Sequence, residues 1–181
     1  MTGVQFFFQT PKIAPKNGMV STLHLLRRDI YSCLGKPHDN INAEIQPVAI
    51  WPGVMLILTG IDLISKFYCG NDSDNKSKER FKIYVEKYID SHSEEIYQLR
   101  NALLHGFSLY SKHRNKEWRY VLGREANYIL TIVPSGIIKV SANQLHLAFE
   151  NSLNQFFIEY PSLPSFSEFD QLNNKYGWTN I

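Results

Sequence analysis

The sequence predicts a mainly α-helical protein that folds as one domain with a small β insertion. Apolar residues recur at intervals of three and four along most of the chain, which is the spacing of a buried helix face. β-branched and aromatic residues gather near 119–141, which is typical of strands. The 181 residues are 44% hydrophobic and 20% charged, so the chain can bury a core. We expect one domain over 1–181, with a helical core at about 20–160 and a C-terminal tail at 161–181 that holds one short helix.

The N-terminal segment predicts a short strand or docking arm, followed by a helix. Val4–Phe8 is largely aromatic, and the prolines at 11 and 15 break any regular structure after it. Ser21–Leu34 carries leucine and isoleucine at helical spacing, and Gly35 follows it as a stop signal. A polar loop at 38–43 then separates this helix from the next.

The longest apolar run, Val48–Ile61, predicts the buried core helix of the domain. This helix is expected from near Pro47 to Tyr68, with Gly70 just beyond its end. The run is too short to span a bilayer, and the N-terminus lacks the features of a signal peptide. The sequence therefore favours a cytoplasmic protein without a membrane segment.

Two further helices are expected before the strands. Lys78–Ile89 is amphipathic, with its apolar residues on one side. Ser91-His92-Ser93-Glu94 resembles a capping box, in which a serine hydroxyl and a glutamate satisfy free N–H groups at a helix start. The next helix should therefore begin near His92 and continue to about Lys112.

Beyond this helix the pattern changes to that of strands. Three short segments are rich in β-branched and aromatic residues, namely Arg119–Gly123, Tyr128–Val133 and Ile137–Ser141. Pro134-Ser135-Gly136 forms a turn between the last two. The segments predict a small antiparallel hairpin or a three-stranded sheet. Asn143–Tyr160 then returns to helical spacing.

The residue inventory gives no support to metal or cofactor chemistry. Cys33 and Cys69 are the only cysteines, and they form neither a CxxC pair nor a Cys/His cluster. The sequence contains no Gly-rich phosphate loop, Ser-His-Asp order or HExxH motif, which disfavours a nucleotide-dependent enzyme and a metalloprotease. The net charge of +2 is nearly balanced, so nucleic-acid binding would need a local basic patch. We expect no metal and no cofactor.

The helix expected at 92–112 carries the strongest chemical signal, because one of its faces is polar. Residues three and four apart share a helix face. The buried stripe is expected to hold Ile96, Leu99, Leu103 and Tyr110, and the polar stripe Gln98, Asn101, His105, Ser108 and Lys112. Arg100 borders the polar stripe. The helix thus holds an amide, an imidazole and a guanidinium together at a surface that suits a phosphate.

These three groups suit RNA cleavage without a metal. The imidazole of His105 can take a proton from a ribose hydroxyl or give one to the leaving oxygen. The guanidinium of Arg100 offers forked donors to a phosphate whose charge rises in the transition state. Asn101 can orient either group or bond the phosphate.

The stretch Arg100-Asn101-Ala102-Leu103-Leu104-His105 resembles the Rx4-6H motif of HEPN domains. The resemblance implies a bundle of four or five helices that dimerises with its motif helices facing each other, and the strands near 119–141 would be an insertion in it. It also implies a metal-independent endoribonuclease that acts on RNA through Arg100, Asn101 and His105 of two subunits. By analogy, it points to a toxin–antitoxin or defence system with an antitoxin-like protein as partner. Other family members are inactive, so a non-catalytic module for dimerisation or for binding RNA or a nucleotide stays open.

Further candidate residues surround the motif. Asp62 lies on an apolar helix, where a carboxylate needs a partner or a cleft, and it can orient Arg100 or His105. A surface position for Asp62 is the simpler alternative. A basic run follows the motif and can track an RNA backbone, although such runs are more often solvated surface; it consists of Lys112, His113, Arg114 and Lys116.

Structural explanations of the motif also stay open. His105 can be a half-buried surface histidine that bonds a backbone carbonyl or caps the helix end. Arg100 can form a salt bridge to Glu95 or Glu159. A lone motif supplies few groups for phosphate chemistry, so the catalytic interpretation includes a symmetric homodimer built partly on this helix.

Overall fold

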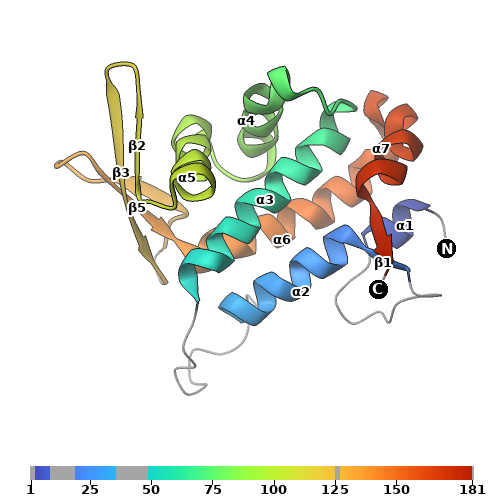
Figure 1. The fold of residues 1–181 in the computed structure, drawn as a ribbon, viewed down its shortest axis with the longest axis horizontal. Coiled ribbons are helices and arrows are strands. Elements are labelled where there is room, and N and C mark those ends of the chain that lie inside the picture. The colour runs from blue at the N-terminus through green and yellow to red at the C-terminus, as the bar shows by residue number, and fades with distance from the viewer. Residues whose placement is uncertain (1–2, 9–18, 36–48, 125–126, 181) are drawn as a thin grey trace.

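Helix α3 (Ile50–Cys69) runs through the middle of the protein, and the other long helices pack on it (Figure 1). These are α2 (Thr22–Leu34), α4 (Ser77–Tyr88), α5 (Ser93–Gly106) and α6 (Ala142–Glu159). The computed structural model describes residues 3–8, 19–35, 49–124 and 127–180, and helices make up 66% of them. The expected mainly helical fold with a small sheet is therefore present.

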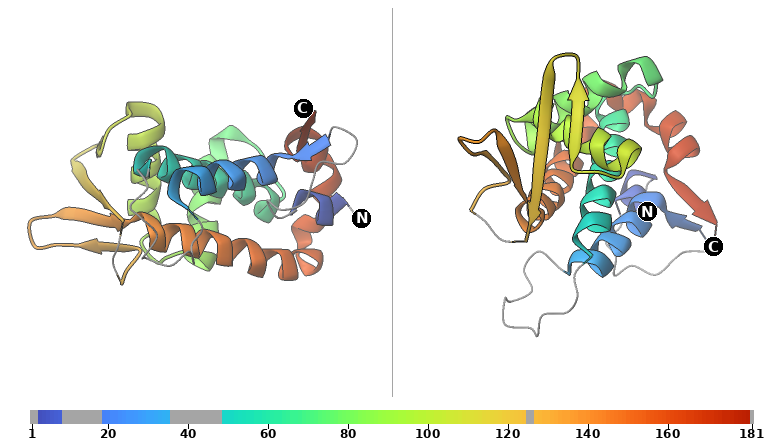
Figure 2. Two further views of the ribbon diagram at one scale, coloured as in Figure 1. Left: turned by 90° about the horizontal axis from the view of Figure 1, so that it is seen from below. Right: turned by 60° about the vertical axis from the view of Figure 1, so that its left-hand side comes forward.

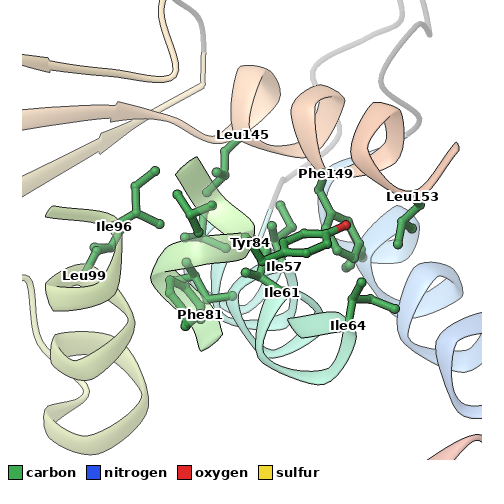
Figure 3. Packing of buried hydrophobic residues seen from close by; sticks show 14 of the residues in the cluster. Ile57, Ile61, Ile64, Phe81, Tyr84, Ile96, Leu99, Leu145, Phe149 and Leu153 are labelled. Carbon is green, nitrogen blue, oxygen red and sulfur yellow. The ribbon is translucent and has the colours of Figure 1, made fainter. Parts of the chain in front are cut away.

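The core is formed by apolar side chains that recur along the helices at intervals of three and four. Figure 3 labels ten fully or almost fully buried members: Ile57, Ile61, Ile64, Phe81, Tyr84, Ile96, Leu99, Leu145, Phe149 and Leu153. Gly60 allows α6 to approach α3 closely, because a Cβ at this position would lie 2.6 Å from Phe149 Cζ. The expected stripe of Ile96, Leu99 and Leu103 is buried as predicted.

Helix α3 is longer than the apolar run counted in the sequence. Its 20 residues are long and apolar enough to cross a membrane by length and composition alone, whereas the expectation of a segment too short to do so concerned only Val48–Ile61. Half of its most apolar stretch is buried inside the structure, as the core-helix interpretation requires. Gly70 ends the helix in the left-handed conformation, at φ 59°, with its N–H bonded to the last turn.

Four strands form a mixed sheet at the end of the bundle opposite α7 (Figures 1 and 2). In spatial order they are β2 (Tyr110–His113), β3 (Lys116–Gly123), β5 (Ile137–Ser141) and β4 (Leu130–Ile132). β2–β3 and β5–β4 pair antiparallel, but β3 and β5 are parallel. The expected antiparallel hairpin with a turn at Pro134-Ser135-Gly136 is therefore confirmed as β4–β5, but the sheet has a fourth strand, β2, and its β3–β5 pair is parallel. Because β5 pairs parallel to β3, Tyr120 lies beside Ile138 on the buried face of the sheet.

Helix α5 begins as expected but ends at Gly106, well before Lys112. Phe107 adopts the left-handed conformation, at φ 44°, and its N–H bonds to the Ala102 carbonyl. The chain then reverses into β2. Ser108 and Lys112 consequently do not continue the helical polar stripe, and Tyr110 is exposed rather than buried.

The start of α5 is not stabilised by the expected capping box. His92 is the N-cap residue, and it has no side-chain cap bond. The Asp90 carboxylate accepts from the His92 N–H at 2.8 Å, and the Ser93 hydroxyl donates to Glu86. The carboxylate of Asp90, the residue just before Ser91, thus binds a backbone N–H at the helix start, and the expected box does not form.

The N-terminal segment is helical, so the expected strand at Val4–Phe8 was wrong. Helix α1 (Gly3–Phe7) buries Phe7 against Phe67 of α3, with ring centroids 4.3 Å apart. The prolines at 11 and 15, the loop at 38–43 and Pro47 lie outside the described residues.

The C-terminal tail is an integral part of the fold. Two 3-10 helices, Tyr160–Ser162 and Pro164–Glu168, lead into α7 (Phe169–Tyr176), which is the short helix expected in this region. Strand β6 (Trp178–Asn180) then pairs antiparallel with β1 (Met19–Ser21). A long-range pair of this kind has no local sequence pattern, so only the short helix of the tail was predicted.

Candidate functional site

The Arg100 side chain is held by three side chains of its own chain. Its Nη2 donates to Asp62 Oδ2 at 2.8 Å, and its Nη1 donates to Asn101 Oδ1 at 3.1 Å. The same Nη1 lies 2.7 Å from His105 Nε2. Asp62 comes from α3 and the other residues from α5, so the network crosses the contact between the two helices. The side chains of Arg100 and Asp62 are only 14% and 21% exposed, which reduces solvent screening of the ion pair.

The contact with Arg100 selects one tautomer of His105. A guanidinium has only donors, so His105 Nε2 must be the acceptor. An imidazole whose Nε2 accepts is neutral and carries its proton on Nδ1. Arg100 therefore holds His105 in one tautomer, with the Nε2 lone pair occupied.

A pocket of about 450 Å³ lies next to this network and shares two of its residues. Its lining comes from α4, α5 and β2 and consists of Lys78, Tyr97, Gln98, Asn101, His105, Ser111, Lys112 and His113. The lining holds two imidazoles and two ammonium groups, and none of these residues is acidic. Arg100 is not among them, so its guanidinium acts on the pocket through Asn101 and His105. Such a lining suits an anion.

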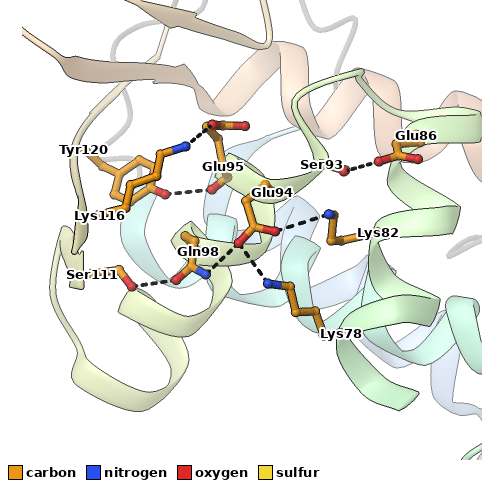
Figure 4. A network of polar contacts seen from close by, with 10 residues as sticks. All are labelled: Lys78, Lys82, Glu86, Ser93, Glu94, Glu95, Gln98, Ser111, Lys116 and Tyr120. Carbon is orange, nitrogen blue, oxygen red and sulfur yellow. Dashed lines mark hydrogen bonds and ion pairs between the residues drawn. The ribbon is translucent and has the colours of Figure 1, made fainter. Parts of the chain in front are cut away.

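A second polar network supports one wall of the pocket (Figure 4). The Glu94 carboxylate contacts Lys78 at 3.0 Å and Lys82 at 3.2 Å, and it accepts from the Gln98 amide at 2.9 Å. The Gln98 oxygen accepts from the Ser111 hydroxyl at 2.8 Å. The chain of contacts therefore joins α4, α5 and β2 around the pocket.

Glu94 is the charged centre of this second network. Burial raises the pKa of its carboxyl, but the hydrogen bonds from Gln98, Lys78 and Lys82 outweigh burial and lower the pKa to about 2. The carboxylate thus stays ionised at any pH at which the protein is expected to work, and it fixes Lys78 at the pocket wall.

The structure brings only part of the expected basic run to the site. Lys112 and His113 line the pocket. Lys112 also lies 3.3 Å from Glu117, and Lys116 lies 3.5 Å from Glu95 with its ammonium over the Trp118 ring. Arg114 is in the tight turn between β2 and β3, at φ 54°, and is exposed.

Two of the structural explanations for Arg100 were wrong. Glu95 pairs with Lys116, and Glu159 pairs with Lys87 at 2.9 Å, so neither carboxylate holds Arg100. The expected contact of Asp62 with Arg100 is present instead.

Three residues of the pocket, Lys78, Tyr97 and Ser111, were not recognised as site residues in the sequence. Tyr97 could have been found, because Tyr97, Asn101 and His105 follow each other at intervals of four on one helix face. Ser111 could not have been found in this way, because its position at the pocket depends on the chain reversal after Gly106.

Comparisons of the chain with protein-family models, curated proteins and solved structures find no match. The HEPN assignment therefore stays a prediction that rests on the motif and on the helical architecture. Among the described residues, no group of three or more His, Cys, Asp or Glu side chains is arranged to hold a metal ion.

Proposed function

We propose that the protein is a metal-independent endoribonuclease whose active site is the pocket between α4, α5 and β2. The observation that carries the proposal is the 2.7 Å contact between Arg100 Nη1 and His105 Nε2, in which the imidazole is the acceptor and lies beside a pocket that Lys78 and Lys112 also line. A neutral imidazole is the form that accepts a proton from a ribose hydroxyl. The HEPN family, the homodimer and a toxin–antitoxin or defence setting belong to the same proposal through the motif alone.

Each motif residue has a role in this proposal. His105 is the catalytic residue that exchanges a proton with the RNA, and Asn101 orients the phosphate from the same helix face. Lys78 and Lys112 offset the charge that rises on the phosphate. Arg100 is a positioning residue in the free protein, because Asp62, Asn101 and His105 already contact both of its Nη atoms.

The contacts of Arg100 with side chains of its own chain also support a second candidate function. A guanidinium that is engaged within its own chain can simply brace α3 against α5. The pocket would then bind RNA or a nucleotide through its phosphate without cutting it. In this case the protein is a non-catalytic binding module.

A cleavage assay separates the two functions. The parent protein is incubated with single-stranded and structured RNA beside His105→Ala and the control His92→Ala, which alters another partly exposed histidine at the opposite end of α5. We expect His105→Ala to lower the cleavage rate by about 10²–10⁴-fold and His92→Ala to leave it unchanged. If the parent binds RNA but cuts none, the binding module is the correct function.

A further inference from the structure

The pocket contains a second imidazole that the motif does not include. His113 is exposed on β2 and lines the same pocket as His105 of α5. The two histidines come from consecutive elements, because the chain reverses at Phe107 and returns along α5. Both imidazoles therefore line the pocket proposed for the phosphate.

A hydrogen bond from β2 to α5 fixes Ser111, two residues before His113. Ser111 lies two residues before His113, and alternate residues of a strand share a face. The Ser111 hydroxyl donates to Gln98 Oε1 at 2.8 Å, and the Gln98 amide is in turn bonded to Glu94 (Figure 4). Gln98 is almost completely buried, so this bond fixes the register of β2 against α5. The hydrogen bond from Ser111 to Gln98 thus anchors the part of β2 that also carries His113.

Cleavage of RNA by its own 2′-hydroxyl needs proton transfer at two places. The bond from the 2′-oxygen to phosphorus forms while the bond from phosphorus to the 5′-oxygen breaks. A base removes the 2′-hydroxyl proton, and an acid gives a proton to the departing 5′-oxygen. The products are a 2′,3′-cyclic phosphate and a free 5′-hydroxyl. The two oxygens lie on opposite sides of the phosphorus, so one imidazole in one position serves only one of them.

We propose that His105 and His113 of one subunit form an acid–base pair, with His105 as the base and His113 as the acid. This inference rests on the proposed endoribonuclease function. Nε2 of His105 is the acceptor in its contact with Arg100, and the ribose hydroxyl takes the place of the guanidinium on that lone pair. His113 is the second imidazole of the pocket and takes the role of the acid. The substrate is RNA rather than DNA, because DNA lacks the attacking hydroxyl.

A substrate with an activated leaving group tests the acid role. In a ribonucleoside 3′-(4-nitrophenyl phosphate), the departing nitrophenolate needs no proton. We expect His113→Ala to cut RNA at least 100-fold more slowly than the parent, yet to stay within about tenfold of the parent on the nitrophenyl substrate. His105→Ala should lose both activities, and the control His92→Ala should lose neither. Thermal melts of all variants show whether they are folded.

The other outcomes of this assay contradict the pair. If the parent and His113→Ala cut RNA equally fast, His113 is not the acid, although the endoribonuclease function stands. If a folded His113→Ala loses activity on both substrates to the same extent, His113 binds the substrate and donates no proton to the leaving group. If the parent cuts neither substrate, the proposed function fails and the pair fails with it.

Mixing the two variants tests whether one subunit supplies both groups. Neither His105→Ala nor His113→Ala contains an intact pair, so a mixture should remain as slow on RNA as the separate variants. If mixing restores cleavage, the two imidazoles come from different subunits, and the one-subunit site is overturned.

Discussion

Asp62 of α3 and Arg100 of α5 form an ion pair across two packed helices, with Arg100 Nη2 2.8 Å from Asp62 Oδ2. Arg100 Nε and Asp62 Oδ1 are buried without a hydrogen-bond partner among the described residues. The ion pair therefore has a single hydrogen bond, the one between Arg100 Nη2 and Asp62 Oδ2. The position of the guanidinium beside His105 therefore depends strongly on this single carboxylate oxygen.

Asp62→Asn should loosen Arg100 and weaken the protein at the same time. The amide keeps the shape of the side chain but removes the charge, and we expect the free energy of unfolding to fall by about 1–3 kcal/mol. RNA cleavage should fall as well, because Arg100 no longer holds His105 in one tautomer. Denaturant unfolding and the cleavage assay measure the two effects. Asp29→Asn is the matched control, because its pair with Arg28 is exposed and contributes little. Equal stability of both variants would contradict a structural role of the Asp62 pair.

Leu103→Ala and His105→Ala should separate folding from chemistry on the same helix. Leu103 is fully buried, so its truncation should cost about 2–5 kcal/mol of stability. His105 is exposed, so its truncation should leave the melting temperature nearly unchanged while cleavage is lost. Calorimetry beside the cleavage assay checks both. An unfolded His105→Ala would instead identify His105 as a structural histidine.

Chelation should not affect RNA cleavage. In the proposed mechanism, the two imidazoles of the pocket supply the proton transfers, and Lys78 and Lys112 supply the positive charge that a metal would otherwise provide. Cleavage rates are compared with and without EDTA, followed by added magnesium or manganese. Activity that disappears with EDTA and returns with either metal would disprove this mechanism.

The protein should form a symmetric homodimer, as the HEPN resemblance implies. The acid–base pair proposed above does not need it, so the dimer tests the family assignment and not the chemistry. Phe107 follows the motif helix and is 67% exposed, which makes it the residue of choice for an interface variant. Light scattering at micromolar concentration should give the mass of two 21.0 kDa chains, and Phe107→Glu should shift it towards one. A parent that is strictly monomeric at these concentrations would contradict the prediction.

Stability should fall as the pH drops from about 6.5 to 4, because of His146. Burial lowers the pKa of this side chain to about 4, with Glu150, which raises it, and Arg27, which lowers it further, as charged neighbours. In this window the unfolded chain binds a proton that the folded protein does not, so unfolding becomes easier by up to about 3 kcal/mol. Chemical denaturation at several pH values should show this slope between pH 6.5 and 5. His146→Gln should flatten it, and a parent without the slope would contradict the prediction.

Helices and strands that have their own local pattern of apolar and capping residues could be predicted from the sequence. The helix after Ser21 starts at Thr22 with the Ser21 side chain as its cap, and the strand Ile137–Ser141 has the expected bounds. The contact of Asp62 with Arg100 could also be anticipated, because a carboxylate on an apolar helix needs a partner.

Features that depend on distant segments could not be predicted in this way. The polar stripe was extended to Lys112 by counting helical positions past Gly106, where the helix in fact ends. Lys112 nevertheless reaches the pocket, but it does so from β2 after the chain reversal. The parallel pairing of β3 with β5 likewise depends on which faces are buried in the assembled fold, and no short stretch of sequence specifies that.

The pairing of β1 with β6 has a consequence for how the chain reaches its final state. Met19 and Asn180 are register partners near opposite ends of the chain, so the loop that this ladder closes contains nearly all of the protein. Closing so long a loop costs more entropy than forming any contact inside it, and the cost is recovered only after the intervening helices have packed. During synthesis, β1 leaves the ribosome long before β6 exists. The two-stranded ladder must therefore be among the last parts of the protein to form.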